Sequence, residues 1–599
     1  MSNTDRDKWY RTRKMNLDKR LITRRMRRAE GATVRHAHRF LVNRWSNVLE
    51  VRKHIIIWMI IVGSLIAAAG LQFIWYQQNY RTTAPSLDGT YAEAALGPID
   101  TLHPLFSNTS AEQSVSYLMF SRLLTYDRTG NLKYDLATDI SVNEDETVYT
   151  VKIRPDVKWH DGASLKARDI AFTVELMKHP ATRSTITGWR DVGVEVIDDT
   201  TVQFTLQFPY AAFRHALNFP IVPRHILGEI TPGTQRESDF SNNPVGSGPF
   251  NFRFTQNIDT ASGRKVIHMA RNDSYYAGKA KLSRFQMHVY NDREAIVTAL
   301  TRGEVNAAAD LSSVEVDNLN PAKYEVIHAP ITSGLYALFN TESDLLKDKT
   351  LRQALNLATD TTAIREQLRS DTPPLYLPFI NGQVKGDGLP APQQHDSSKA
   401  EALLIGDGWV PNASGVREKD GKELRLSAVT LKNSESESIL EELVRQWREV
   451  GIVVDTQVVD PSDVLEDVTQ NILRPRNYDV LIYQLNIGAD PDVYAYWHSS
   501  QATPQGFNLS NYKNAISDDA LASARSRGDA ALRNAKYITF ARQWASDVPA
   551  IALYQLSVRY VHTTSARSVV YGTVLVSPIN RYVDVLDWSV GKRTVYKTP

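Results

Sequence analysis

The side chains that could do chemistry in this chain are scattered and match no known catalytic arrangement. The sequence contains no cysteine, which excludes disulfides, thiolate nucleophiles, thiolate metal sites and a lipid-bearing cysteine. Gly246-Ser247-Gly248 lacks the spacing of a hydrolase nucleophile elbow, and no phosphate-binding glycine loop or paired metal-ligand histidine motif occurs. His160-Asp161 is an isolated pair and His498 an isolated histidine. We therefore predict that the protein is not an enzyme and needs no cofactor or metal.

Length and composition indicate a large structure that folds mostly in water. The chain has 599 residues, whereas a usual domain has about 100 to 200, so more than one hydrophobic core is expected. Hydrophobic residues make up 42% and charged residues 23%, close to the average for soluble globular proteins. This composition shows no collagen-like, disordered or multi-span bias.

One segment near the N-terminus is apolar enough to cross a membrane. Residues 55–76 read IIIWMIIVGSLIAAAGLQFIWY, 22 residues without a charge, and a helix needs roughly 20 apolar residues to span a bilayer. Arg52 and Lys53 precede it, so the positive-inside rule predicts a cytoplasmic N-terminus and an extracellular or periplasmic body. A cleaved signal peptide is the alternative, because Ala67-Ala68-Ala69 is the small-residue pattern that signal peptidase needs. The long preceding region and the apolar residues after this pattern favour a retained anchor.

Residues 1–54 form a strongly basic arm. They contain 16 Lys or Arg and five Asp or Glu, a net charge of +11, so the other 545 residues carry −9. The run Arg24-Arg25-Met26-Arg27-Arg28 could bind nucleic acid, but no recognition motif accompanies it. Attraction to anionic lipid headgroups and control of topology explain the run more simply, so we predict no nucleic-acid partner. An anchored sensory or interaction protein, in which the arm passes information inward, is an alternative function.

After a short polar tether at residues 77–89, two stretches alternate between apolar and polar residues and predict half-buried strands. Their apolar positions are Tyr149, Val151 and Ile153 in the first, and Val202, Phe204, Leu206 and Phe208 in the second.

Two other stretches place apolar residues on one stripe of a helix. They are Leu351, Ala354, Leu355 and Ala358, and then Ile439, Leu440, Leu443, Val444 and Trp447. Ser438 with Glu441 predicts a capping box at the start of the second helix, and Gly451 predicts a left-handed stop at its end. The residues from Ile452 to Val459 then predict a strand, which completes a helix-to-strand unit of an α/β lobe.

The order of elements from Tyr117 to Met177 resembles the family 5 extracellular solute-binding proteins, the peptide, dipeptide and nickel receptors of ABC importers. In this segment Asp127 to Gly130 predicts a turn, and Asp161-Gly162 turns the chain into a helix that Ser164 can cap. The resemblance covers roughly residues 89–588. It continues through Pro244-Val245-Gly246-Ser247-Gly248-Pro249-Phe250, Tyr275-Tyr276, Gly303-Glu304-Val305, Leu338-Phe339-Asn340, Asp490-Pro491-Asp492 and Gly506-Phe507-Asn508.

This resemblance implies a two-lobed α/β fold of the periplasmic-binding-protein type, in the large type II peptide-binding class with an extra subdomain. One transmembrane helix precedes it here. Crossing strands join the lobes, and the ligand lies between them. The implied boundaries are residues 86–111, 222–330 and 553–599 for lobe I, 112–221 for the inserted subdomain, and 331–552 for lobe II.

The resemblance also implies where a ligand is held. On lobe I we expect a main-chain contact at Gly97, Pro98 and Ile99. On lobe II we expect contacts from the strand and loop that contain Leu485, Asn486, Gly488, Asp490, Tyr494 and Trp497. The two aromatic residues are either apolar walls of the site or plain core residues.

In peptide-binding members of the family a carboxylate near this loop pairs with the amino terminus of the ligand. Here the usual position falls near Ile487 or Gly488, and neither is acidic. Either Asp490 substitutes for this anchor or the anchor is absent.

Together these inferences predict the substrate-binding component of an ABC importer at the cell membrane. It captures oligopeptides between two lobes and delivers them to the permease and its ATPases, because a ligand that contacts both lobes favours the closed form. The same role for another solute, such as an oligosaccharide or a metal complex, is the nearest alternative. A hydrolase on the same scaffold is a more distant one.

Overall fold

The computed structural model describes residues 51–259, 263–309, 311–368, 372–461 and 467–596. The chain divides into two compact units. One unit contains the segment before Pro85 together with the residues from Arg593 onward, and the other is the body, Pro85–Lys592. The basic run at Arg24–Arg28 lies outside the described residues.

The first unit contains the apolar helix α3, Arg52–Tyr80. Its stretch Arg52–Gln78 has a mean hydropathy of 2.2, and its apolar window is not buried by the protein. By length and composition it can cross a membrane, as predicted from residues 55–76. The predicted tether is more ordered than expected, because β1, Arg81–Pro85, pairs with the C-terminal strand β23, Lys592–Tyr596.

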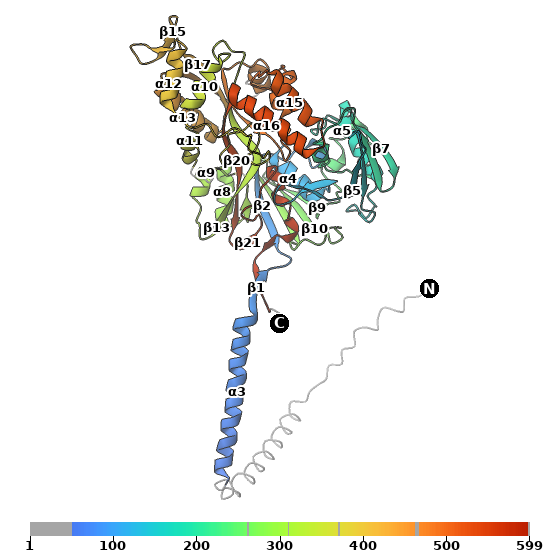
Figure 1. The fold of residues 1–599 in the computed structure, drawn as a ribbon. Helices are drawn as coiled ribbons and strands as arrows, with labels where there is room; N and C mark the ends of the chain where they lie inside the picture. Colours follow the sequence, from blue (N-terminus) through green and yellow to red (C-terminus); the bar gives the residue numbers. More distant parts are fainter. Residues whose placement is uncertain (1–50, 260–262, 310, 369–371, 462–466, 597–599) are drawn as a thin grey trace. The chain divides into compact units, whose positions relative to one another are not determined.

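The body is built around one mixed sheet of ten strands (Figure 1). In spatial order these are β18 (Val453–Val459), β17 (Arg425–Leu431), β19 (Val480–Asn486), β13 (Tyr324–Phe339), β20 (Ala550–Thr563), β12 (Ala307–Ala308), β2 (Thr90–Leu96), β11 (Arg284–Tyr290), β10 (Arg264–Arg271) and β9 (Phe250–Asp259).

Two long antiparallel strands, β13 with 16 residues and β20 with 14, connect the two halves of this sheet. The first part of β13 pairs with the end of β20 that also pairs with β12. The second part, from Ser333, pairs with β19. The register between β13 and β20 shifts between Pro330 and Gly334 and again between Leu335 and Tyr336. The sheet therefore consists of two ladders that meet at an irregular junction in the crossing strands.

Helices cover both faces of the half of the sheet that contains β19. On one face α10, Lys349–Ala358, and α13, Ser434–Glu449, bury their apolar stripes in one core cluster. On the other face α16, Ala530–Asp547, packs with α15, Ala515–Arg525, in a second cluster. Fully buried Trp447 and Trp497 belong to the first and second cluster respectively.

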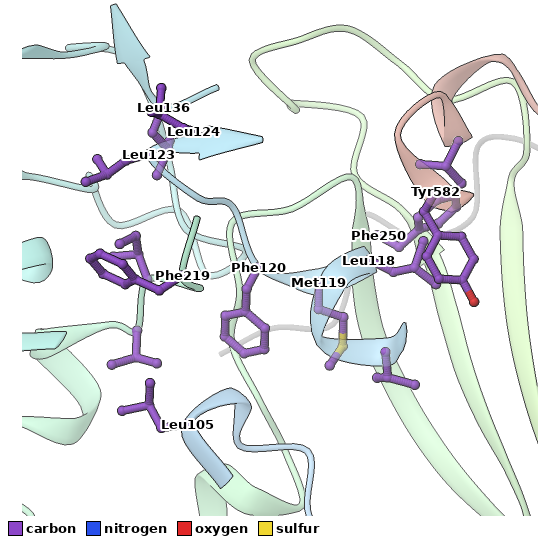
Figure 2. Packing of buried hydrophobic residues seen from close by; sticks show 14 of the residues in the cluster. Leu105, Leu118, Met119, Phe120, Leu123, Leu124, Leu136, Phe219, Phe250 and Tyr582 are labelled. Atoms are coloured by element: carbon purple, nitrogen blue, oxygen red, sulfur yellow. The ribbon is translucent and has the colours of Figure 1, made fainter. Parts of the chain in front are cut away.

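The half of the sheet that contains β2 is covered by α4, Ser110–Met119, on one face and by α8, Arg293–Arg302, on the other. The core around α4 is the largest, and Figure 2 shows part of it, from Leu105 to Tyr582. It extends without a break into a separate antiparallel sheet of four strands, β5 (Ala137–Val142), β6 (Val148–Ile153), β8 (Thr201–Thr205) and β7 (Gly193–Asp198).

This four-stranded sheet and helix α5, Ala167–Lys178, lie beside the main sheet, where Figure 1 draws them in teal. A short hairpin, β3 (Leu124–Tyr126) and β4 (Leu132–Tyr134), connects them to α4. We call residues 112–221 the inserted subdomain. The exact lobe boundaries stay a prediction.

Most local predictions agree with the structure. The predicted faces of β6, α10 and α13 are buried, except that Val444 is half-buried. Gly451 has a φ of +85° and directly follows Val450, the C-cap residue of α13, and β18 begins one residue later than predicted.

Three local predictions were wrong. Phe208 is 77% exposed, because β8 ends at Thr205 and the alternation of buried and exposed residues along the strand does not extend to position 208. Helix α5 begins at Ala167 after Lys166, so Ser164 does not cap it. Helix α13 begins earlier than predicted: Asn433 accepts hydrogen bonds from the backbone N–H groups of Glu435 and Ser436, so Ser438 lies inside the helix.

Candidate ligand-binding site at the crossing strands

The predicted lobe I contact lies at the level of the junction in the crossing strands. Across the sheet, Glu93 of β2 is aligned with Ala307, then with His562 of β20 and Glu325 of β13. Four residues further along the parallel strands β2 and β13, the same alignment places Gly97 beside the position of Ala329, just before the junction. At the usual spacing between strands, the three steps from β2 to β13 amount to roughly 14 Å. An extended ligand of a few residues could span this distance.

The chain turns sharply at Gly97, where β2 ends. Gly97 has a φ of +101°, which favours glycine, and its N–H donates to the carbonyl of Tyr290 at 2.9 Å. The carbonyl of Pro98 accepts from Thr109 Oγ1 at 3.0 Å, and that of Ile99 accepts from Lys265 Nζ at 3.0 Å. At two of the three positions predicted to contact a ligand, Pro98 and Ile99, the carbonyl thus already has a partner from its own half of the sheet.

On the other side of the junction, the end of β19 is fastened to the crossing strand β13. Leu485 is buried, whereas the Asn486 side chain accepts from Ser333 Oγ at 2.8 Å. Gly488 has a φ of +83°, its N–H donates to the carbonyl of Thr332 at 3.1 Å, and its carbonyl accepts from Gln383 Nε2 at 2.7 Å. The loop after β19 therefore starts directly at the junction.

Asp490 in this loop is held by a cation of its own half of the body. Arg533 of α16 donates to its two carboxylate oxygens at 3.0 and 2.7 Å, and both side chains are largely buried. His215 of the inserted subdomain approaches the same carboxylate, with its Nε2 3.9 Å from Oδ2. The Nδ1 atom of His215 lies 3.2 Å from the hydroxyl of Tyr126.

Asp492 takes part in a second contact with the inserted subdomain. Its carboxylate lies 3.7 Å from Arg525 Nε, and the Arg525 guanidinium carbon lies between the rings of Tyr210 and Tyr494, at 4.8 and 4.7 Å from their centres. The backbone N–H of Ala211 donates to the carbonyl of Arg525 at 3.0 Å.

We refer to these residues together as the bridging contact. It comprises Tyr126, Tyr210, Ala211 and His215 on the inserted subdomain, and Asp490, Asp492, Tyr494, Arg525 and Arg533 on the facing half.

Burial changes the protonation equilibria in the bridging contact. Desolvation raises the pKa of Asp492, and Arg525 opposes this rise. Desolvation also lowers the pKa of His215, an effect that Asp490 opposes and Arg533 reinforces. His215 is therefore neutral at pH 7, and the charge of Asp490 is matched by Arg533.

The two predicted aromatic residues differ in their surroundings. Trp497 is fully buried and packs edge-to-face against Trp544, with ring centres 5.6 Å apart, so the structure supports its core alternative. Tyr494 is half-buried, and its ring stacks on His498 with centres 4.0 Å apart.

Sequence reasoning did not identify Tyr210, His215, Arg525 or Arg533. Each stands in a stretch without a motif, and no local signal indicates which distant residue it meets. Within the described residues, no group of three or more His, Asp or Glu side chains is arranged to hold a metal ion.

Comparison with known proteins agrees with this architecture. The sequence model of the bacterial extracellular solute-binding proteins, family 5, matches residues 131–507. The oligopeptide-binding protein AppA of Bacillus subtilis is 30% identical over 490 residues, which cover 78% of this chain and 87% of AppA.

Solved structures give the same result. The structure of AppA from Bacillus subtilis in complex with a nonapeptide matches 85% of this chain and all of its own, with a TM-score of 0.67 and 26% identity. NikZ from Campylobacter jejuni in complex with Ni(L-His) covers 84% of this chain and 99% of its own, with a TM-score of 0.69 and 26% identity. The predicted fold class is therefore confirmed as a two-lobed α/β fold of the type II periplasmic-binding-protein kind. The chain belongs to the bacterial extracellular solute-binding proteins of family 5.

Proposed function

We propose that this protein is the membrane-anchored receptor of an ABC importer and that it captures oligopeptides between its two lobes for delivery to a permease. One observation carries the proposal. The crossing strands β13 and β20 change register between Pro330 and Gly334, at the level at which we predict the ligand contacts of both lobes. A ladder interrupted at this position supplies a hinge, because fewer regular hydrogen bonds must bend when the lobes move.

The bridging contact stabilises the closed arrangement in this proposal. It joins the inserted subdomain to the facing half through Asp490, which His215 approaches, and through Arg525, which contacts Tyr210 and Ala211. Ligand that contacts both lobes adds to these interactions and shifts the population toward the closed form. The permease would then recognise the closed receptor.

Support for a peptide ligand comes from AppA, whose solved structure holds a nonapeptide. The pairing of Asp490 with Arg533 argues against a free carboxylate for the ligand's amino terminus at this position. A non-peptide solute, such as the metal complex held by NikZ, is therefore the second candidate.

Native mass spectrometry of the gently released body, followed by denaturation, separates these two ligand classes. A series of peptide masses supports the peptide receptor. One constant non-peptide mass rejects peptide specificity and leaves the receptor role intact.

Anchoring by α3 is also part of the proposal. Its length and mean hydropathy of 2.2 suit a membrane span, and a signal sequence has the same properties. Intact mass of the protein from its native membrane tests this directly, since cleavage after Ala69 would remove the residues up to that position. Protease treatment of cells from which any outer membrane and cell wall have been removed then tests the orientation: a body degraded from outside supports the proposal, and a protected body contradicts it.

A further inference from the structure

A buried arginine outside the bridging contact has no ionic partner among the residues that the structure describes. Arg122 follows α4 and is only 6% exposed. Its backbone is fixed, because its N–H donates to Asp135 Oδ2 at 3.2 Å and its carbonyl accepts from Leu136 at 2.9 Å. These contacts fix the position from which the side chain extends.

The guanidinium group of Arg122 is only partly satisfied by the protein. Its Nη1 donates to the carbonyl of Phe120 at 3.1 Å, and its carbon lies 4.3 Å from the centre of the Tyr117 ring. Among the described residues, Nε and Nη2 have no acceptor, and the group forms no ion pair. An unpaired buried charge is strongly unfavourable, so a missing counter-ion is the simplest explanation.

Asp135 does not supply this counter-ion. One of its carboxylate oxygens accepts from the backbone of Arg122, and the other accepts from the hydroxyl of Tyr276. Its charge acts on Arg122 from a distance, but neither oxygen bonds the guanidinium group.

Arg122 lines a cavity of about 180 Å³ between α4, the β3–β4 hairpin and the segment with Tyr275 and Tyr276. The lining contains three cations, Arg122, Lys133 and Arg154, and one carboxylate, Asp135. Arg154 uses its Nε for the carbonyl of Asp135 at 2.9 Å, whereas the side chain of Lys133 forms no hydrogen bond or ion pair with the described residues. The cavity thus has an excess of positive charge.

We propose that this cavity binds a small oxyanion, either phosphate-like or a short carboxylate, through Nε and Nη2 of Arg122. The planar fork of a guanidinium group matches two oxygens of such an anion. The volume corresponds to about six water molecules, which is enough for an anion of this size. This site is separate from the bridging contact and does not depend on the proposed transport function.

Binding at this site connects segments that are distant in the chain, because Tyr582 and Leu586 of the C-terminal region line the same cavity. Because the cavity exists only when these segments are folded together, an anion bound there stabilises the folded body by mass action.

The test is thermal unfolding of the full chain in detergent, in Tris-chloride buffer at constant ionic strength. Phosphate, sulfate, acetate and succinate are added in turn, and isothermal titration calorimetry measures binding. We expect one anion class to raise the melting temperature by about 2 °C or more at saturation. A response to phosphate and sulfate assigns a tetrahedral anion, and a response to acetate and succinate assigns a carboxylate.

Three variants test the assignment. In R122M the anion response should disappear, while the melting temperature without anion stays equal or rises because an unpaired buried charge has been removed. In the matched control R128Q, which changes a half-exposed arginine paired with Asp584, the response should remain. K133Q, on an exposed side chain, should require several-fold more anion for half-saturation.

No response to any of the four anions would overturn the proposal, as would a normal response in R122M. If R122M does not fold, K133Q decides the question, and an unchanged half-saturation in that variant rejects the site.

Discussion

Glu93 and Arg581 form an ion pair in which both side chains are fully buried, although 488 residues separate them in the chain. Arg581 donates from Nε and Nη2 to Glu93 Oε1 at 3.0 and 2.6 Å. The hydroxyls of Tyr560 and Tyr582 donate to the same carboxylate at 2.8 and 2.7 Å. The pair thus ties the C-terminal 3-10 helix, Pro578–Tyr582, to the central strand β2.

Replacing Arg581 by Met should strongly destabilise the body. Glu93 would remain buried without a cation, which costs about 3 to 5 kcal/mol of unfolding free energy. Urea denaturation followed by tryptophan fluorescence measures this cost. The control is R567M on an exposed arginine of β21, Ala566–Arg567, which should change stability by less than about 0.5 kcal/mol. Strictly additive losses in the E93Q/R581M double variant would contradict a coupled pair.

Replacing Asp490 by Asn should weaken the closed arrangement. Asp490 is the residue of this half that His215 of the inserted subdomain approaches, and without its carboxylate the Arg533 cation would face the subdomain unpaired. We therefore expect a loss of about 1 to 3 kcal/mol. The sequence has no cysteine, so two introduced cysteines, E195C and A522C, would be the only sites that take a spin label. Double electron–electron resonance then measures the distribution of distances between the two labels. The distribution should broaden toward longer distances in D490N.

D519N is the matched control for this experiment. Asp519 of α15 pairs with Lys536 at 2.9 Å on α16, the helix that also carries Arg533, but the Asp519 side chain is 71% exposed. An exposed pair contributes less than about 1 kcal/mol, so the distance distribution should stay unchanged. Equal distributions in D490N and the unsubstituted protein would show that the bridging contact does not hold the lobes together.

Two buried histidines should make the protein less stable in mild acid. Desolvation lowers the pKa of His103 to about 3 and that of His160 to about 4, from an ordinary value of 6.5. The unfolded chain therefore binds protons first, and stability that is complete above pH 6.5 is lost as the pH falls toward these values. At pH 5 each histidine should reduce the unfolding free energy by about 2 kcal/mol.

Urea denaturation at pH 7.5 and pH 5.0 measures this loss. His160 accepts from the N–H of Gly246 at 3.2 Å through Nδ1 and donates to the carbonyl of Gly248 at 3.0 Å through Nε2, which requires the neutral ring. H160Q should reduce the difference between the two pH values by about 2 kcal/mol. An identical difference in this variant would show that His160 does not contribute to acid sensitivity.

Adding a methyl group at Gly334 should disturb the junction of the crossing strands. A Cβ atom there would overlap Leu375 and lie 2.8 Å from Tyr336 Cε2. Such overpacking typically costs about 1 to 3 kcal/mol, so G334A should lower the melting temperature. G406A is the control, because a Cβ at Gly406 in α12, Ser397–Gly406, meets no atom within 4 Å. A melting temperature in G334A as high as in G406A would mean that the junction tolerates a side chain.

Local patterns in the sequence predicted individual elements well where one face is buried. The stripe Leu351, Ala354, Leu355 and Ala358 and the alternation in β6 each depend on only a few neighbouring residues. Helix starts were less reliable, because the cap of α13 is Asn433 and the same stretch contains several other capping residues.

The partners of charged residues could not be predicted. Nothing near Asp490 in the sequence indicates that Arg533 reaches it from α16, or that His215 approaches from the inserted subdomain. Trp497 illustrates the same limit, since its residue type and its place in the sequence fit both a cleft wall and the core position in which it lies. Burial of this kind depends on the packing of distant helices and is not encoded in any short window.

The pairing of β1 with β23 determines where foreign sequence can be attached to this protein. Because Ser86 donates to the carbonyl of Gly591 at 3.0 Å, the body begins and ends at the same place. A reporter fused to the C-terminus would therefore follow the strand that pairs with β1, and β1 itself directly follows the apolar helix. An insertion at the exposed turn Asp420-Gly421, between β15 (Arg417–Lys419) and β16 (Lys422–Glu423), leaves both ends of the body unobstructed.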